Sequence, residues 1–92
     1  MKDLDWSAEK NRQLIDNRSV SFEDVVFCLL NDRLLDDIKH PNADKYPNQR
    51  VFVIEIDGYA YLVPYVESEL SIFLKTVIPS RKATKQYLRK KK

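Results

Sequence analysis

The chain has 92 residues and a formal net charge of +2, with 43% hydrophobic and 33% charged residues. These values are typical of one small globular domain over residues 1–92 and exclude a disordered chain, which is poorer in hydrophobic residues. The single cysteine, Cys28, excludes an intrachain disulfide and indicates a reducing compartment. No stretch resembles a signal peptide or a membrane span, so we expect a soluble, cytoplasmic protein without membrane contact.

The charge is divided unevenly along the chain. Residues 1–46 carry seven basic and ten acidic side chains, whereas residues 47–92 carry nine basic and four acidic ones. From Lys75 to the end there are eight Lys or Arg residues and no Asp or Glu. Such an end attracts a polyanion, but it also fits an acidic protein partner or a solvated helix end.

The first half of the chain predicts two helices, over residues 8–17 and 20–31. The second opens with a capping box from Ser21 to Asp24. Its apolar residues recur at helical spacing and predict one buried face, made of Phe22, Val25, Val26, Leu29 and Leu30. We expect Cys28, beside this face, to be a buried hydrophobic residue and not a nucleophile.

The second half predicts strands. Residues 33–38 form a short strand candidate, and residues 39–49, with two prolines and two asparagines, predict a loop. Asp57-Gly58 between two β-rich runs is the signature of a hairpin with a type I′ turn. This turn sets the register and places Arg50 opposite Tyr65 at the open end of the hairpin.

A third long strand is expected over residues 70–78 and a terminal helix over residues 80–91. The order of elements predicts an α+β fold. Its small antiparallel sheet would hold the short strand and a three-stranded meander, with two N-terminal helices and one C-terminal helix.

The candidate site residues are those expected at the open end of the meander. The strands contribute Arg50, Tyr65, Glu67 and Lys75, the long loop His40, Lys45 and Tyr46, and the turn after the third strand Ser80, Arg81 and Lys82. Cleavage of RNA by its own 2′-hydroxyl needs a base, an acid and cations around the phosphate. We therefore expect catalytic roles for His40, Arg50, Lys75 and Arg81. Tyr46 or Tyr65 would stack a base, and Lys45, Lys82 and Lys85 would bind the RNA backbone.

Each of these residues also has a structural interpretation. A histidine before proline is more often a turn residue, and alternating tyrosines are usually a packed sheet face. One histidine and one cysteine cannot form a zinc site, and one glycine excludes a Gly-rich phosphate loop. We expect neither a metal nor a cofactor.

Several short motifs in this order resemble the BrnT-like toxins of bacterial type II toxin–antitoxin systems. They are WSAEKN near the start, VSFEDVVF at the second helix, KHP before the loop, the basic residue that opens the first long strand, and SRKAT near the end. By position, His40, Arg50, Arg81, Lys82 and Thr84 match the family's motifs, and Lys75 lies close to the family's arginine on the last strand.

This resemblance implies a RelE-like fold and a ribonuclease that cleaves mRNA, either free or bound to the ribosome, to inhibit translation. It also implies a cognate protein antitoxin, through which the complex binds operator DNA. Two other interpretations stay open: a non-catalytic BrnT-like module that binds a protein, and a nucleic-acid-binding protein that uses the basic tail alone.

Overall fold

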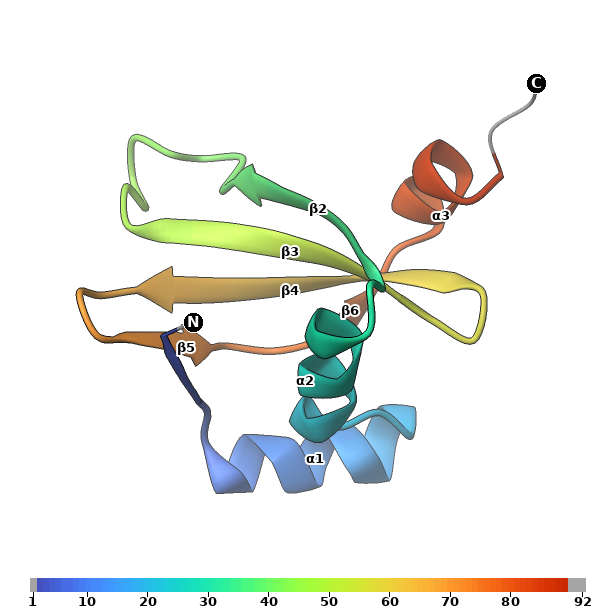
Figure 1. Cartoon of the computed structure of the whole chain (residues 1–92), viewed down its shortest axis with the longest axis horizontal. Helices are drawn as coiled ribbons and strands as arrows, with labels where there is room; N and C mark the ends of the chain where they lie inside the picture. The colour runs from blue at the N-terminus through green and yellow to red at the C-terminus, as the bar shows by residue number, and fades with distance from the viewer. Residues whose placement is uncertain (1, 90–92) are drawn as a thin grey trace.

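The fold is α+β and contains three helices and six strands within residues 2–89, the part of the chain that the computed structural model describes (Figure 1). In chain order the elements are β1 (Asp3–Asp5), α1 (Ala8–Arg18), α2 (Phe22–Leu30), β2 (Leu34–Lys39), β3 (Gln49–Ile56), β4 (Tyr59–Glu67), β5 (Ser71–Leu74), β6 (Ile78–Pro79) and α3 (Arg81–Tyr87). The predicted class, helix order and hairpin are therefore confirmed.

The sheet is mixed, whereas the sequence predicted a purely antiparallel sheet. Its strand order is β1-β5-β4-β3-β2, with β6 also paired to β4. The short β1 runs parallel to β5, and the other pairs are antiparallel. Strand β1 has only three residues, too few to show the alternation that marks a strand in a sequence. Its pairing also depends on β5, which is far away in the sequence.

The single long strand predicted over residues 70–78 is divided into β5 and β6. Val77 lies between them with its side chain fully buried, and its carbonyl oxygen accepts a hydrogen bond from Arg18 Nη1 at 2.6 Å. That carbonyl is therefore satisfied by α1 and not by the sheet. The prediction of one continuous strand was wrong because alternation cannot reveal a tertiary contact of this kind.

The β3–β4 hairpin has the predicted turn and register. Asp57 and Gly58 have φ angles of 52° and 79°, as a type I′ turn requires. Ile56 pairs with Tyr59, and at the other end Arg50 pairs with Tyr65. This register determines which side chains share each face of the sheet.

Helices α1 and α2 cover one face of the sheet, called here the α1/α2 face (Figure 1). The cap of α1 is Ser7, and the predicted capping box of Ser21 and Asp24 is present. Cys28 is buried as expected, and burial raises the pKa of its thiol. Leu30 departs from the prediction: its side chain is 66% exposed because α2 ends there and turns away from the sheet.

Helix α3 lies on the opposite face, called here the α3 face (Figure 1). Ser80 caps it as predicted, and Ala83 packs against Val53 and Ala60 of the sheet. The helix ends at Tyr87, before the predicted end at residue 91, which lies outside the described residues. Within residues 2–89 no helix has the length and apolar character needed to cross a membrane.

Candidate site at the open end of the sheet

The ends of β2, β3 and β4 that lie away from the Asp57-Gly58 turn border an open cleft of about 660 Å³. This open-end cleft is lined by Lys2, Lys39, Ala43, Pro47, Asn48, Gln49, Arg50, Glu67, Ser68 and Glu69. Lys39 and Arg50 are partners in neighbouring strands, so both side chains project from the α1/α2 face. The cleft therefore brings cations from two strands together with carboxylates from the end of β4 and the turn after it.

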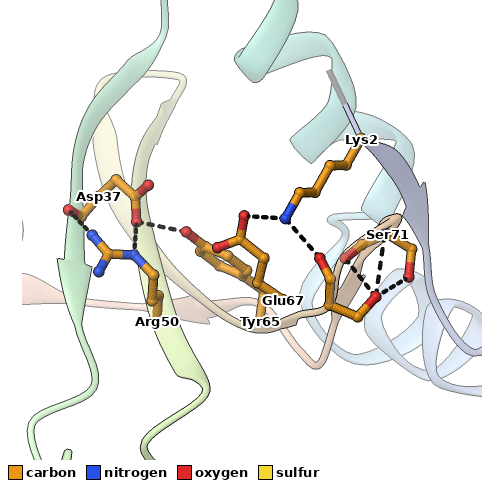
Figure 2. Close-up of polar contacts among 7 residues, drawn as sticks. Lys2, Asp37, Arg50, Tyr65, Glu67 and Ser71 are labelled. Carbon is orange, nitrogen blue, oxygen red and sulfur yellow. Dashed lines mark hydrogen bonds and ion pairs between the residues drawn. The ribbon is translucent and has the colours of Figure 1, made fainter.

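Arg50 is held in a fixed position by Asp37 on the neighbouring strand (Figure 2). Its Nε donates to Asp37 Oδ1 at 3.1 Å and its Nη2 to the Asp37 carbonyl oxygen at 3.0 Å. The Tyr65 hydroxyl donates to the same carboxylate oxygen at 2.7 Å. The Tyr65 hydroxyl and the Asp37 carboxylate raise the pKa of Arg50, so the guanidinium stays charged and oriented.

A second ion pair closes the other side of the cleft (Figure 2). Lys2 Nζ lies 2.8 Å from Glu67 Oε2 and 2.6 Å from the carbonyl oxygen of Ser68. The hydrogen bond from Lys2 and its charge lower the pKa of Glu67. Parallel pairing of β1 with β5 brings Lys2 to this position from the far end of the sequence.

The loop between β2 and β3 carries an aromatic pair. The rings of His40 and Tyr46 lie 4.7 Å apart between centroids, and Lys45 Nζ lies 5.5 Å from the centre of the Tyr46 ring. The backbone N–H of Asn42 donates to His40 Nδ1 at 3.0 Å. A neutral His40 in this geometry carries its proton on Nε2, which is the atom left to exchange a proton with a ligand.

Only part of the predicted site is brought together. The backbones of His40 and Arg50 are close, because Lys39 pairs with Arg50 and the His40 N–H donates to the carbonyl oxygen of Gln49 at 3.2 Å. The side chains of His40, Lys45 and Tyr46 form their own group in the loop and do not line the cleft. Lys75 is opposite Pro64, since its N–H donates to the Pro64 carbonyl oxygen at 2.8 Å. Strand alternation then places its side chain on the α3 face, away from Arg50.

The expectation that the turn before α3 joins the open end is wrong. Pro79 pairs with Tyr61, four residues from Tyr65 towards the hairpin turn, and the Ser80 N–H donates to the Ala60 carbonyl oxygen. Four strand residues correspond to about 13 Å. The α3 residues Arg81, Lys82 and Lys85 are therefore at the hairpin end of the opposite face, apart from the cleft.

Tyr65 is not available to stack on a base. Its side chain is 2% exposed, and its ring stacks on Phe52 at 4.0 Å between centroids. Burial, followed by the hydrogen bond to Asp37, raises the pKa of its hydroxyl. The role that fits these contacts is positioning of Asp37 and, through it, of Arg50, while Tyr46 in the loop remains a candidate for base stacking.

Two charged residues that line the cleft, Lys2 and Lys39, were missed from the sequence, and so was Asp37, which holds Arg50 in place. The alternation of Asp37 and Lys39 was a usable signal, since two charged residues on one face of a strand indicate a solvent-facing position. Their approach to Arg50 depends on the register between β2 and β3. A nine-residue loop does not determine that register, whereas the two-residue turn of the next hairpin does.

The described residues form no group of three or more side chains suited to hold a metal ion. No protein-family model matches the chain, and no curated protein or solved structure is significantly similar to it. Functional inference therefore rests on the chemistry of the cleft and on the motifs in the sequence.

Proposed function

We propose that the chain is the toxin of a bacterial type II toxin–antitoxin system, a metal-independent endoribonuclease of the BrnT-like and RelE-like kind that cleaves mRNA in the cytoplasm. The observation that carries this proposal is the grouping of His40, Tyr46 and Lys45 in the loop that leads into β3, which begins beside the fixed Arg50. Together these residues supply a proton carrier, a stacking ring and cations, the groups that cleavage of single-stranded RNA requires.

In the proposed reaction the 2′-hydroxyl of a nucleotide attacks the adjacent phosphate. A new bond forms between phosphorus and O2′, and the bond between phosphorus and O5′ breaks, leaving a 2′,3′-cyclic phosphate and a 5′-hydroxyl. The proton of the 2′-hydroxyl passes to solvent water as the new bond forms. His40 Nε2–H donates a proton to O5′ as it leaves, and Lys45 is the second candidate for this donation. Arg50 and Lys39 stabilise the negative charge that builds on the phosphate oxygens.

The basic residues outside the cleft have a separate role in this proposal. Arg81, Lys82 and Lys85 contact phosphates of RNA that extends beyond the cleft, either in free mRNA or on the ribosome. A protein antitoxin covers the toxin when growth is not arrested, and operator DNA is bound only through that antitoxin.

A second candidate is a non-catalytic BrnT-like module that binds a protein. One observation favours it: two of the cleft cations, Lys2 and Arg50, already lie against the carboxylates of Glu67 and Asp37. Such pairs weaken the attraction for phosphate, whereas they are common in protein interfaces. Simple nucleic-acid binding through α3 alone would use neither His40 nor the cleft.

The test is induced expression in bacteria of the wild type and of H40A and R50K, with growth and total RNA followed at early times. We expect growth arrest and mRNA loss with the wild type. Removal of an acid or base typically costs about 10²–10⁴-fold in rate, so H40A is expected to abolish toxicity. R50K keeps the charge but loses the two-point contact with Asp37, so a partial loss is expected.

The control is R12A, which removes an exposed arginine of α1 outside the cleft and is expected to stay fully toxic. R81A, on α3, is expected to reduce toxicity by less than H40A. A folded wild type that leaves growth and RNA intact would favour the binding module. Equal toxicity of wild type and H40A would remove His40 from the reaction.

A further inference from the structure

The α3 face of the sheet is only half covered by its helix. Helix α3 has seven residues and is about 10 Å long, whereas the eight residues of β3 extend over about 26 Å. The hydrogen bond from the Ser80 N–H to the Ala60 carbonyl oxygen holds the start of α3 at the hairpin end. In the part of the chain that the structure describes, no helix lies over the half of this face nearer the open end (Figure 1).

The uncovered half carries a row of apolar side chains, of which Ile38, Phe73 and Ile78 are exposed, Pro64 and Val66 are half-buried, and Val51 at the centre is 5% exposed. Val51 pairs with Ile38 on one side and with Pro64 on the other, and Val66 pairs with Phe73 on the next strand. The side chains of Ile38 and Phe73 are each 37% exposed. We call these residues, with Ile78 of β6, the uncovered strip: Ile38, Val51, Pro64, Val66, Phe73 and Ile78.

The strip continues into a groove beneath α3. Ile38, Val53 and Leu62 form the floor of this groove, and Lys82 and Gln86 of α3 form its rim. Its volume is about 350 Å³. An apolar side chain inserted next to α3 would therefore meet apolar sheet residues below and polar helix residues above.

The charges around the strip are mainly positive. Lys82 is at the rim of the groove, and Lys75 is exposed beside Pro64. Two carboxylates share this face: Asp36, which stays ionised because a 2.6 Å hydrogen bond from the Tyr87 hydroxyl lowers its pKa, and Glu55, which lies 3.5 Å from Arg33. Basic side chains outnumber them, since α3 alone contains three basic residues and no acidic one. Among residues 2–89, no carboxylate is within ion-pair distance of Lys75 or Lys82.

We propose that the uncovered strip binds an amphipathic helix with acidic flanks, contributed by a protein partner. Four strands, β2 to β5, span about 14 Å, which suits one helix about 10 Å in diameter lying beside α3. The apolar side of the partner helix would cover Phe73 and Ile38, and its carboxylates would meet Lys75 and Lys82. This inference does not rest on the proposed ribonuclease activity.

Two other occupants fit the strip less well. Single-stranded RNA stacks its bases on aromatic rings, but the strip offers one such ring, Phe73, among aliphatic side chains. A second copy of this chain would bring the same surface to itself in a symmetric contact. Both copies would bring Lys75, Lys82 and the basic helix α3 to the same interface, which holds no excess of carboxylates to meet them.

The experiment is a titration of the ¹⁵N-labelled full chain with a synthetic helical peptide of about 20 residues. The peptide has Leu on one face and Glu on its flanks, and a shuffled peptide of the same composition, which has no apolar face, is the control. We expect saturable binding with a Kd below about 1 mM. The amide shifts should concentrate at Ile38, Phe73, Ile78 and Lys82.

Two variants test the surface itself. F73S is expected to weaken binding about tenfold, while L70S, which removes a 79% exposed leucine from the β4–β5 turn, leaves it unchanged. K82E changes an exposed residue with little risk to folding and is also expected to weaken binding, whereas R12E on α1 is not. Circular dichroism confirms that each variant is folded.

The proposal is overturned by an absence of saturable binding, by equal binding of the shuffled peptide, or by shifts centred on the exposed Phe27 and Leu30 of α2. It is also overturned if an RNA oligonucleotide displaces the peptide and shifts the amides of the apolar residues Ile38 and Phe73, because the strip itself would then belong to nucleic acid. The peptide titration measures binding and not toxicity, so the result of the titration is independent of the ribonuclease proposal.

Discussion

The two faces of the sheet are packed in different ways. On the α1/α2 face, large apolar side chains such as Phe22, Ile54 and Leu74 are completely excluded from solvent. On the α3 face the small side chain of Ala83 in the helix packs on Ala60 of the sheet, and the buried polar residue Thr84 joins helix to sheet. Burial of large apolar side chains therefore holds α1 and α2 on the first face. On the second face, the attachment of α3 depends more on a few hydrogen bonds.

Replacement of Phe22 by Ala should have the largest effect on stability. Phe22 is fully buried, and its ring stacks on Trp6 at 5.6 Å between centroids. Loss of a buried phenylalanine costs about 3–5 kcal/mol because apolar contacts are lost and a cavity remains. Chemical denaturation followed by circular dichroism measures this change in the free energy of unfolding.

The matched control is F27A in the same helix. Phe27 is 58% exposed, so its removal is expected to cost well under 1 kcal/mol, as for most surface changes. Similar losses for the two variants would contradict the assignment of the main core to the α1/α2 face.

Replacement of Thr84 by Val should have an intermediate effect, confined to the α3 face. Thr84 Oγ1 accepts from the buried Ala60 N–H at 2.9 Å and donates to the Ser80 carbonyl oxygen at 2.8 Å. Valine has nearly the same shape but leaves the Ala60 N–H unpaired, which costs about 1–3 kcal/mol. Hydrogen exchange should show faster exchange for α3 amides, with α2 amides less affected.

The control for this variant is T76V, since Thr76 is half-buried and makes no side-chain hydrogen bond among the described residues. Uniform loss of protection across both faces in T84V would mean that α3 and the main core unfold as one unit. The two faces would then differ in packing but not in local stability.

Much of the fold could be predicted because its signals are local. The capping box at Ser21 and the type I′ turn at Asp57-Gly58 each act within a few residues, and both are present. The predictions failed where a distant segment decides the outcome. The parallel pairing of β1, and the division of residues 70–78 around Val77, both depend on contacts with segments far away in sequence.

The candidate site was predictable in part for the same reason. The hairpin register placed Arg50 opposite Tyr65, and His40 is in the loop that leads to Arg50. Arg81 was expected nearby because the last strand was taken as continuous, whereas β6 returns to the hairpin end of β4. The ion-pair partners Asp37 and Lys2 come from strands whose register no turn determines.

The smallest expected effect concerns Tyr65, the residue that links the α1/α2 core to the open-end cleft. Burial, and then the hydrogen bond to Asp37, raises the pKa of its hydroxyl above the ordinary value of about 10. A raised folded-state pKa means that the neutral phenol stabilises the fold. This stabilisation is fully present below pH 10 and is lost as the pH rises through the folded-state value.

Y65F removes this titration together with one hydrogen bond. At neutral pH the variant should lose about 1 kcal/mol, since Arg50 continues to satisfy the Asp37 carboxylate. Between pH 9 and 11 its stability should fall less steeply than that of the wild type, because a phenylalanine has no proton to lose. Urea midpoints measured across this range, with Y46F in the loop as control, give the two slopes. Parallel slopes would show that Tyr65 ionises equally easily in the folded and unfolded chains, and would contradict a raised pKa of its hydroxyl.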